Sequence, residues 1–152
     1  MLKEIAHIGI TVNDIEKSID FYKNILGLKF QGELVMEGKE TDLLFARKNS
    51  KVRVAYLSGS DLISSPPVEL IQFLSNDYEK NEINLHRGSI SEICFYVEDM
   101  DKAYNQLLKK GVEFISDPQT FDFSKQGYGK SKAVYFKDVD GIILELMEVI
   151  KE

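Results

Sequence analysis

The chain has 152 residues, of which 43% are hydrophobic and 29% charged, and its formal net charge is −6. This composition is ordinary for a folded domain, and the length suits one domain or two fused half-domains. The acidic balance argues against a nucleic-acid partner, which needs a basic surface. We expect a cytoplasmic protein without a membrane partner, because the sequence has no signal-peptide pattern and no apolar run long enough to span a bilayer.

Cysteine usage agrees with a reducing compartment. Cys94 is the single cysteine of the chain, so an internal disulfide is excluded. A lone cysteine in an apolar stretch behaves as a small hydrophobic residue, and we expect Cys94 to lie in the core.

The first half of the chain predicts one amphipathic helix among several short strands. The helix is expected over residues 14–25, with Asn13-Asp14 as its capping pair and Gly27 just after its end. Alternating or β-branched segments predict strands at residues 5–12, 28–35, 42–47, 51–58 and 68–74. Residues 59–67, rich in Gly, Ser and Pro, are expected to form a loop.

The second half predicts a similar succession after a polar connector at residues 75–88. A helix is expected over residues 99–110, capped by Asp99 and closed by Gly111. Strands are expected at residues 90–97, 112–116, 132–136 and 142–149. Residues 117–130 are expected to form a long loop over the mouth of a cleft, from which Gln126 and Tyr128 reach a substrate.

The second half also begins like the first. Residues 6–14 align with residues 91–99, and each half closes on a hydrophobic strand that contains one carboxylate. The duplication indicates a first module at residues 1–76, a connector at 77–89 and a second module at 90–152. Four polar side chains fall at matching points of the two modules, as a central site requires: His7, Glu69, Glu92 and Glu145.

These motifs resemble the vicinal oxygen chelate superfamily, which includes glyoxalase I, methylmalonyl-CoA epimerase, extradiol dioxygenases, and the fosfomycin- and bleomycin-resistance proteins. The matching strings cover residues 7–14, 21–28, 68–70, 95–101 and 134–146, so the resemblance extends over nearly the whole chain. It implies an α+β fold in which two βαβββ modules form a curved mixed sheet around a cleft. It also implies a homodimer.

In proteins of this superfamily, the first and last strands of each module supply the ligands of a divalent metal ion. Position by position, the resemblance implies that His7, Glu69, Glu92 and Glu145 are the ligands here. Glu92 departs from the family pattern, which has histidine at this place, and a chain that has lost the metal remains an open alternative. Three carboxylates suit Mn²⁺ or Mg²⁺, and one imidazole extends the range to Fe²⁺, Co²⁺, Ni²⁺ or Zn²⁺.

The resemblance to glyoxalase I and the epimerase implies a metal-dependent lyase or isomerase that transfers a proton through a metal-stabilised enediolate. Glu145, Glu69 and Glu92 are the candidate catalytic carboxylates, and the sequence does not separate the base from the ligands. Arg47 and Arg53 are candidates to bind an anionic small-molecule substrate. The alternative is a metal-free protein that sequesters an aromatic ligand. An extradiol-type dioxygenase ranks last, because Glu92 removes one histidine of the metal triad.

Overall fold

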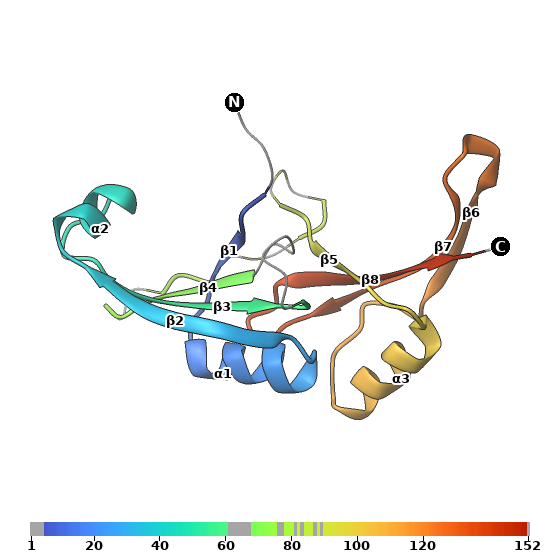
Figure 1. Ribbon diagram of the computed structural model, residues 1–152, viewed down its shortest axis with the longest axis horizontal. Helices are drawn as coiled ribbons and strands as arrows, with labels where there is room; N and C mark the ends of the chain where they lie inside the picture. Colours follow the sequence, from blue (N-terminus) through green and yellow to red (C-terminus); the bar gives the residue numbers. More distant parts are fainter. Residues whose placement is uncertain are drawn as a thin grey trace. The chain divides into compact units, whose positions relative to one another are not determined.

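The computed structural model describes residues 5–60, 68–75, 78–80, 82, 84–86, 88 and 90–151. The chain divides into two compact units, Met1–Lys80 and Asn81–Glu152, and each contains its own four-stranded sheet (Figure 1). In the described part of the chain, no helix is both long and apolar enough to cross a membrane.

The sheet of the first unit has the strand order β1-β4-β3-β2. Its strands are β1 (Ile8–Thr11), β2 (Lys29–Glu37), β3 (Lys51–Ser58) and β4 (Val68–Phe73). The pair β1·β4 is parallel, and the pairs β3·β4 and β2·β3 are antiparallel. A parallel pair needs a crossover connection, which here contains helix α1 (Ile15–Asp20) and a π-helical turn, η1 (Phe21–Ile25). The helix expected over residues 14–25 is present as α1 and η1 together.

The sheet of the second unit repeats this arrangement in the order β5-β8-β7-β6. Its strands are β5 (Ile93–Tyr96), β6 (Gln119–Phe123), β7 (Gly129–Lys137) and β8 (Ile143–Ile150). Helix α3 (Met100–Lys109) follows β5, and a 3₁₀ turn, η2 (Ser124–Gln126), lies between β6 and β7. Both units are βαβββ modules, so the α+β fold expected from the sequence is confirmed.

Each helix is attached to its sheet in the same way. The Asp14 carboxylate accepts hydrogen bonds from the first-turn amides of α1, and the Asp99 carboxylate does the same for α3. A side chain of the last strand accepts the next orphan amide: Gln72 accepts from Ile15, and Glu148 accepts from Met100. Because Ile15 and Met100 are fully buried, these bonds seat the apolar face of each helix on the core.

In each unit an ion pair also links the helix to the third strand of its sheet. Arg53 on β3 pairs with Glu16 of α1 at 2.7 Å, and Lys132 on β7 pairs with Asp101 of α3 at 2.9 Å. Arg53 also pairs with Glu33 on β2 at 2.6 Å. These pairs show which face of each sheet its helix covers.

The strand expected at residues 42–47 is wrong, because this segment begins inside helix α2 (Lys39–Leu44). The β2·β3 ladder closes at the pair Glu37 and Lys51, so the chain between them leaves the sheet. Gly38, at φ 102°, turns the chain out of β2. The Asp42 carboxylate accepts hydrogen bonds from the amides of Asn49 and Ser50, and it thereby closes the turn into β3.

Two expectations for the second unit are also wrong. Residues 112–116 form no strand, and only Phe114 makes an isolated bridge, to Phe136 of β7. The expected loop at residues 117–130 contains strand β6 and the start of β7. All five residues of β6, the edge strand of the sheet, are exposed, so no buried face marks this short segment as a strand.

Candidate functional site

The candidate site residues lie on the face of each sheet opposite its helix, which we call the site face. Successive side chains of a strand point to opposite faces of the sheet. Arg53 and Gln72 reach α1, so Tyr56 and Glu69, three residues away from them, lie on the site face of the first sheet. By the same argument from Lys132 and Glu148, Tyr135 and Glu145 lie on the site face of the second sheet.

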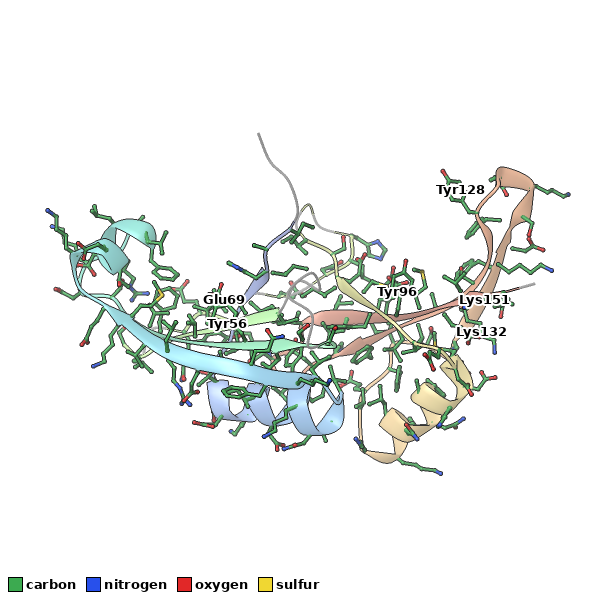
Figure 2. The ribbon with its side chains drawn as sticks, in the orientation of Figure 1. Tyr56, Glu69, Tyr96, Tyr128, Lys132 and Lys151 are labelled. Atoms are coloured by element: carbon green, nitrogen blue, oxygen red, sulfur yellow. The ribbon has the colours of Figure 1, made fainter. Side chains whose placement is uncertain are left out.

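The first cluster is centred on the Glu69 carboxylate. The imidazole Nε2 of His7 lies 3.1 Å from Glu69 Oε2, and the Tyr56 hydroxyl donates a hydrogen bond of 2.7 Å to Glu69 Oε1 (Figure 2). The Glu69 side chain is only 12% exposed, whereas the His7 side chain is 46% exposed. The hydrogen bond to Glu69, assisted by burial, raises the pKa of Tyr56 to about 12. Glu69 is thus fixed from two sides while His7 remains accessible.

The local sequence explains why His7 reaches Glu69. His7 immediately precedes β1, and Gly9 on β1 is directly opposite Glu69 in the parallel pair. A Cβ atom at Gly9 would lie 3.4 Å from Glu69 Oε2 and 3.1 Å from the Ile71 side chain. Glycine at this position therefore avoids a tight contact with Ile71 beside the Glu69 carboxylate.

The second cluster is centred on the Glu145 carboxylate. Glu145 on β8 is directly opposite Cys94 on β5 and Tyr135 on β7. Burial raises the pKa of Glu145, a hydrogen bond from the Cys94 thiol opposes this effect, and the negative charge of Glu92 adds to it. Burial, followed by the charge of Glu145, raises the pKa of Cys94 to about 12. Burial and the same charge also raise the pKa of Tyr135.

The two clusters match residue by residue. In the registers of the two sheets, Glu69 corresponds to Glu145 and Tyr56 corresponds to Tyr135. Gly9 corresponds to Cys94, so a thiol occupies the place that is empty beside Glu69. The alignment of residues 6–14 with 91–99 places Glu92 at the position of His7. Each unit thus builds one polar cluster from the same strands.

Sequence reasoning missed the two tyrosines, although a signal for them was present. The string Arg53-Val-Ala-Tyr56 corresponds to Lys132-Ala-Val-Tyr135, with a basic residue three places before each tyrosine. The expectation that Cys94 lies in the core is wrong, because the residue is exposed. The side chains of β5 that point to the site face have no helix to cover them.

None of the four residues expected to bind substrate belongs to the polar cluster of its own unit. Arg53 lies on the helix face, where its guanidinium pairs with Glu16 and Glu33. The Arg47 guanidinium lies 5.5 Å from the centre of the Phe73 ring. Gln126 belongs to η2, and Tyr128, which is 84% exposed, follows it near the tip of the β6–β7 hairpin (Figure 2). A substrate role for these four residues stays a prediction.

The donor atoms of the two clusters suit a divalent ion. An imidazole nitrogen and a carboxylate oxygen face each other in the first cluster, and the second holds two acidic side chains, Glu92 and Glu145. Such nitrogen and oxygen donors bind hard and borderline divalent metals. Within the described residues, no three His, Cys, Asp or Glu side chains gather into a metal centre. Neither cluster supplies a full ligand set by itself.

Comparison with known proteins now identifies the class of protein. The family model described as the Glyoxalase/Bleomycin resistance protein/Dioxygenase superfamily matches residues 4–146, so the chain belongs to this superfamily. Its membership agrees with the paired βαβββ modules and with the resemblance stated from the sequence.

Three similar proteins illustrate the range of the superfamily. The uncharacterized protein YwkD of Bacillus subtilis is 30% identical over 97% of this chain and 98% of its own length. The mitochondrial methylmalonyl-CoA epimerase of Homo sapiens is 27% identical over 95% of this chain and 73% of its own length. A glyoxalase family protein from Bacillus cereus, a solved structure, has a TM-score of 0.84 with 22% identity, covering 99% of this chain and 97% of its own.

Proposed function

We propose that the protein is a metal-dependent lyase or isomerase that moves a proton between adjacent carbon atoms of a small substrate. The chemistry would be that of a lactoylglutathione lyase or an epimerase. The observation that carries this proposal is the different environment of two matched glutamates. Glu69 is held by His7 and Tyr56, whereas the pKa of Glu145 is raised by burial. Similarity to an epimerase supports the same kind of reaction.

We propose different tasks for the two carboxylates because their environments differ. Two contacts fix the oxygens of Glu69, and a fixed carboxylate with an adjacent imidazole suits a metal ligand. A general base works best when its pKa lies near the working pH, so the upward shift at Glu145 suits proton abstraction. In the proposal His7, Glu69 and Glu92 hold the ion, and Glu145 carries the proton. A bound divalent ion supplies Lewis-acid stabilisation of negative charge on a substrate oxygen.

The proposal is tested first by the metal content of untagged protein, measured by mass spectrometry after chelation and after reloading with Mn²⁺, Ni²⁺, Co²⁺ or Zn²⁺. We expect stoichiometric, reloadable metal that is lost in His7→Ala, because the imidazole is the only nitrogen donor of the proposed set. The control is Glu98→Gln, which changes an exposed glutamate outside both clusters. Absence of metal under every loading condition would overturn the proposal.

The base is tested separately by Glu145→Gln. Hemithioacetals and acyl-CoA epimers are screened as substrates, and exchange of the substrate proton with solvent deuterium is followed by NMR. We expect Glu145→Gln to keep the fold and to lose activity by about 10²- to 10⁴-fold, the range typical of a removed general base. Normal turnover by this variant would contradict the role of Glu145.

A second candidate function is metal-free binding of an aromatic compound. It is favoured by the rings of Phe121 and Phe123 on β6, which stack at 5.7 Å with an interplanar angle of 5°. Tyr96 and Tyr128 are also strongly exposed in the second unit (Figure 2). Aromatic faces attract planar and cationic ligands. If the protein takes up no metal and binds an aromatic cation tightly, metal-free binding replaces the enzymatic function as the proposal.

Two further proposals concern the protein in the cell. We propose a homodimer, as the superfamily resemblance implies, and a cytoplasmic location, which the lone cysteine supports. Sedimentation measurements and cell fractionation test them.

A further inference from the structure

The second unit contains a pocket of about 420 Å³ at one end of its sheet. It is lined by Asn84, Leu85, His86, Glu113, Phe114, Ile115, Lys137 and Ile143. Lys137 and Ile143 are paired across β7 and β8, and they lie two residues from Tyr135 and Glu145. Because side chains two residues apart share a face, both point to the site face.

We propose that this pocket binds the carboxylate end of an aliphatic acid. Leu85, Ile115 and Ile143 offer apolar walls, and Lys137 offers a cation at their edge. A volume of this size suits a small organic ligand held by apolar surface and a few polar groups. Lys137 is the less exposed member of an ion pair with Glu113 in this lining, so we assign to its ammonium group the contact with a ligand carboxylate.

The present partner of Lys137 is easily exchanged. Its Nζ lies 2.8 Å from Oε1 of Glu113, but the two side chains are 41% and 71% exposed, and exposed ion pairs contribute little. The Glu113 side chain can therefore turn into solvent and leave the ammonium group to a ligand carboxylate. His86 and Asn84, at the rim, add nitrogen groups that can hydrogen-bond to the same ligand.

The pocket lies on the same face of the sheet as Glu145, the proposed base. Two residues of a strand span roughly 7 Å, so a carboxylate at Lys137 lies that far along the sheet from Tyr135. A substrate anchored there would extend along the site face toward Glu145. The inference that the bound acid is the substrate rests on the proposed function. Binding of the acid to the pocket does not depend on a metal.

Binding is tested with chelated, metal-free protein by NMR titration with butanoate, hexanoate and octanoate. We expect affinity to rise about fourfold for each added methylene group until the pocket is filled, since each buried methylene contributes a roughly constant free energy. Hexylamine has the same chain with the opposite charge and is expected not to bind at the pocket. Equal binding of hexanoate and hexylamine would overturn the proposal.

Variants locate the site. Lys137→Met is expected to weaken hexanoate binding by about tenfold or more, because a charge-assisted hydrogen bond is lost. Glu113→Gln is expected to strengthen it by about two- to fivefold, because the competing carboxylate is removed. The control Lys109→Met removes a lysine of α3 outside the pocket lining and should change nothing.

The outcomes separate this proposal from the proposed function. Unchanged hexanoate affinity in Glu113→Gln and Lys137→Met would overturn the pocket assignment while leaving the metal proposal intact. If Glu113→Gln binds hexanoate more tightly and the native protein takes up no metal under any loading condition, the pocket is supported and the metal-dependent enzyme is overturned. If Lys137→Met does not fold, Glu113→Gln decides alone.

Discussion

Glu69 and Glu145 occupy equivalent places in two sheets and have different neighbours. Glu69 is opposite Gly9 on β1, the first strand of its unit, and Glu145 is opposite Cys94 on β5, the first strand of the other unit. The His7 imidazole contacts Glu69, whereas the Cys94 thiol donates a hydrogen bond to Glu145. The exchange of neighbours at two matched positions thus distinguishes the two carboxylates chemically.

Tyr56 stabilises the fold through its bond to Glu69. Tyr56→Phe leaves a mostly buried carboxylate oxygen without its donor, so we expect the free energy of unfolding to fall by about 1 to 3 kcal/mol. Urea denaturation measures the loss. The matched control is Tyr104→Phe, which removes an exposed hydroxyl bond to Asp117 and should cost much less. Equal losses in the two variants would show that the bond to Glu69 has no special weight.

The same bond predicts a dependence on alkaline pH. The pKa of Tyr56 is raised from 10.0 to about 12 in the folded protein. The unfolded chain therefore releases this proton first, and the contribution of Tyr56 is complete below pH 10 and is lost as the pH rises toward 12. We expect the difference in stability between the native protein and Tyr56→Phe to shrink over this window. A constant difference between pH 9 and 12 would contradict the assignment.

At the level of residues, the sequence predicts the carboxylates better than their surroundings. Glu69 and Glu145 are visible because a single acid inside an apolar strand is unusual, and they recur in both halves. Tyr56 was missed because tyrosine is common in strands, and the only signal for it, the matching string around Tyr135, does not reveal its polar partner. The partners of Arg53 could not be foreseen, since they lie on α1 and β2, far from it in sequence.

At the level of elements, both helices depend on a hydrogen bond from the last strand of their unit. Glu148 accepts from the amide of Met100 at 2.8 Å, in the role that Gln72 has for Ile15. Glutamine and glutamate serve equally well here because either offers an oxygen to the amide. The position therefore supplies a hydrogen-bond acceptor in both units, although its side chain is neutral in the first unit and negatively charged in the second.

This interchange gives a prediction for α3. Glu148→Gln keeps the acceptor, so we expect the free energy of unfolding to change by less than about 0.5 kcal/mol. Glu148→Met has a similar size but leaves the Met100 amide without a partner, which costs about 1 to 3 kcal/mol. Thermal unfolding of both variants measures the difference. A large loss in Glu148→Gln would show that the charge, not the acceptor, supports the helix.

The elements also show where sequence patterns fail. Helices α1 and α3 were predicted because caps and apolar spacing agree in both, and β3 because its segment is short and largely apolar. Helix α2 was mistaken for a strand because Leu43 and Leu44 look like core residues, yet both are exposed. Strand β6 was missed because Pro118 and the two glycines at 127 and 129 indicate a loop, whereas the segment pairs with the following strand as a hairpin at the sheet edge.

At the level of the whole molecule, the metal proposal links the stability of both units to one ligand. An ion that binds only the folded state, at a hundred times its dissociation constant, raises the free energy of unfolding by about 2.7 kcal/mol. We expect this gain in the native protein and its loss in His7→Ala or Glu92→Ala, one variant in each unit. Urea denaturation with and without Mn²⁺ measures it. A full gain in either variant would show that its unit does not bind the ion.

The registers of the two sheets also show where the chain tolerates added length. The equivalent pairs Gly9 and Cys94, Tyr56 and Tyr135, and Glu69 and Glu145 are separated by 85, 79 and 76 residues. The first unit thus holds six extra residues before β3, in the stretch that includes α2, without a change in strand order. Because the strand order is the same with and without these residues, the excursion through α2 is the place to insert an affinity peptide or a labelled loop.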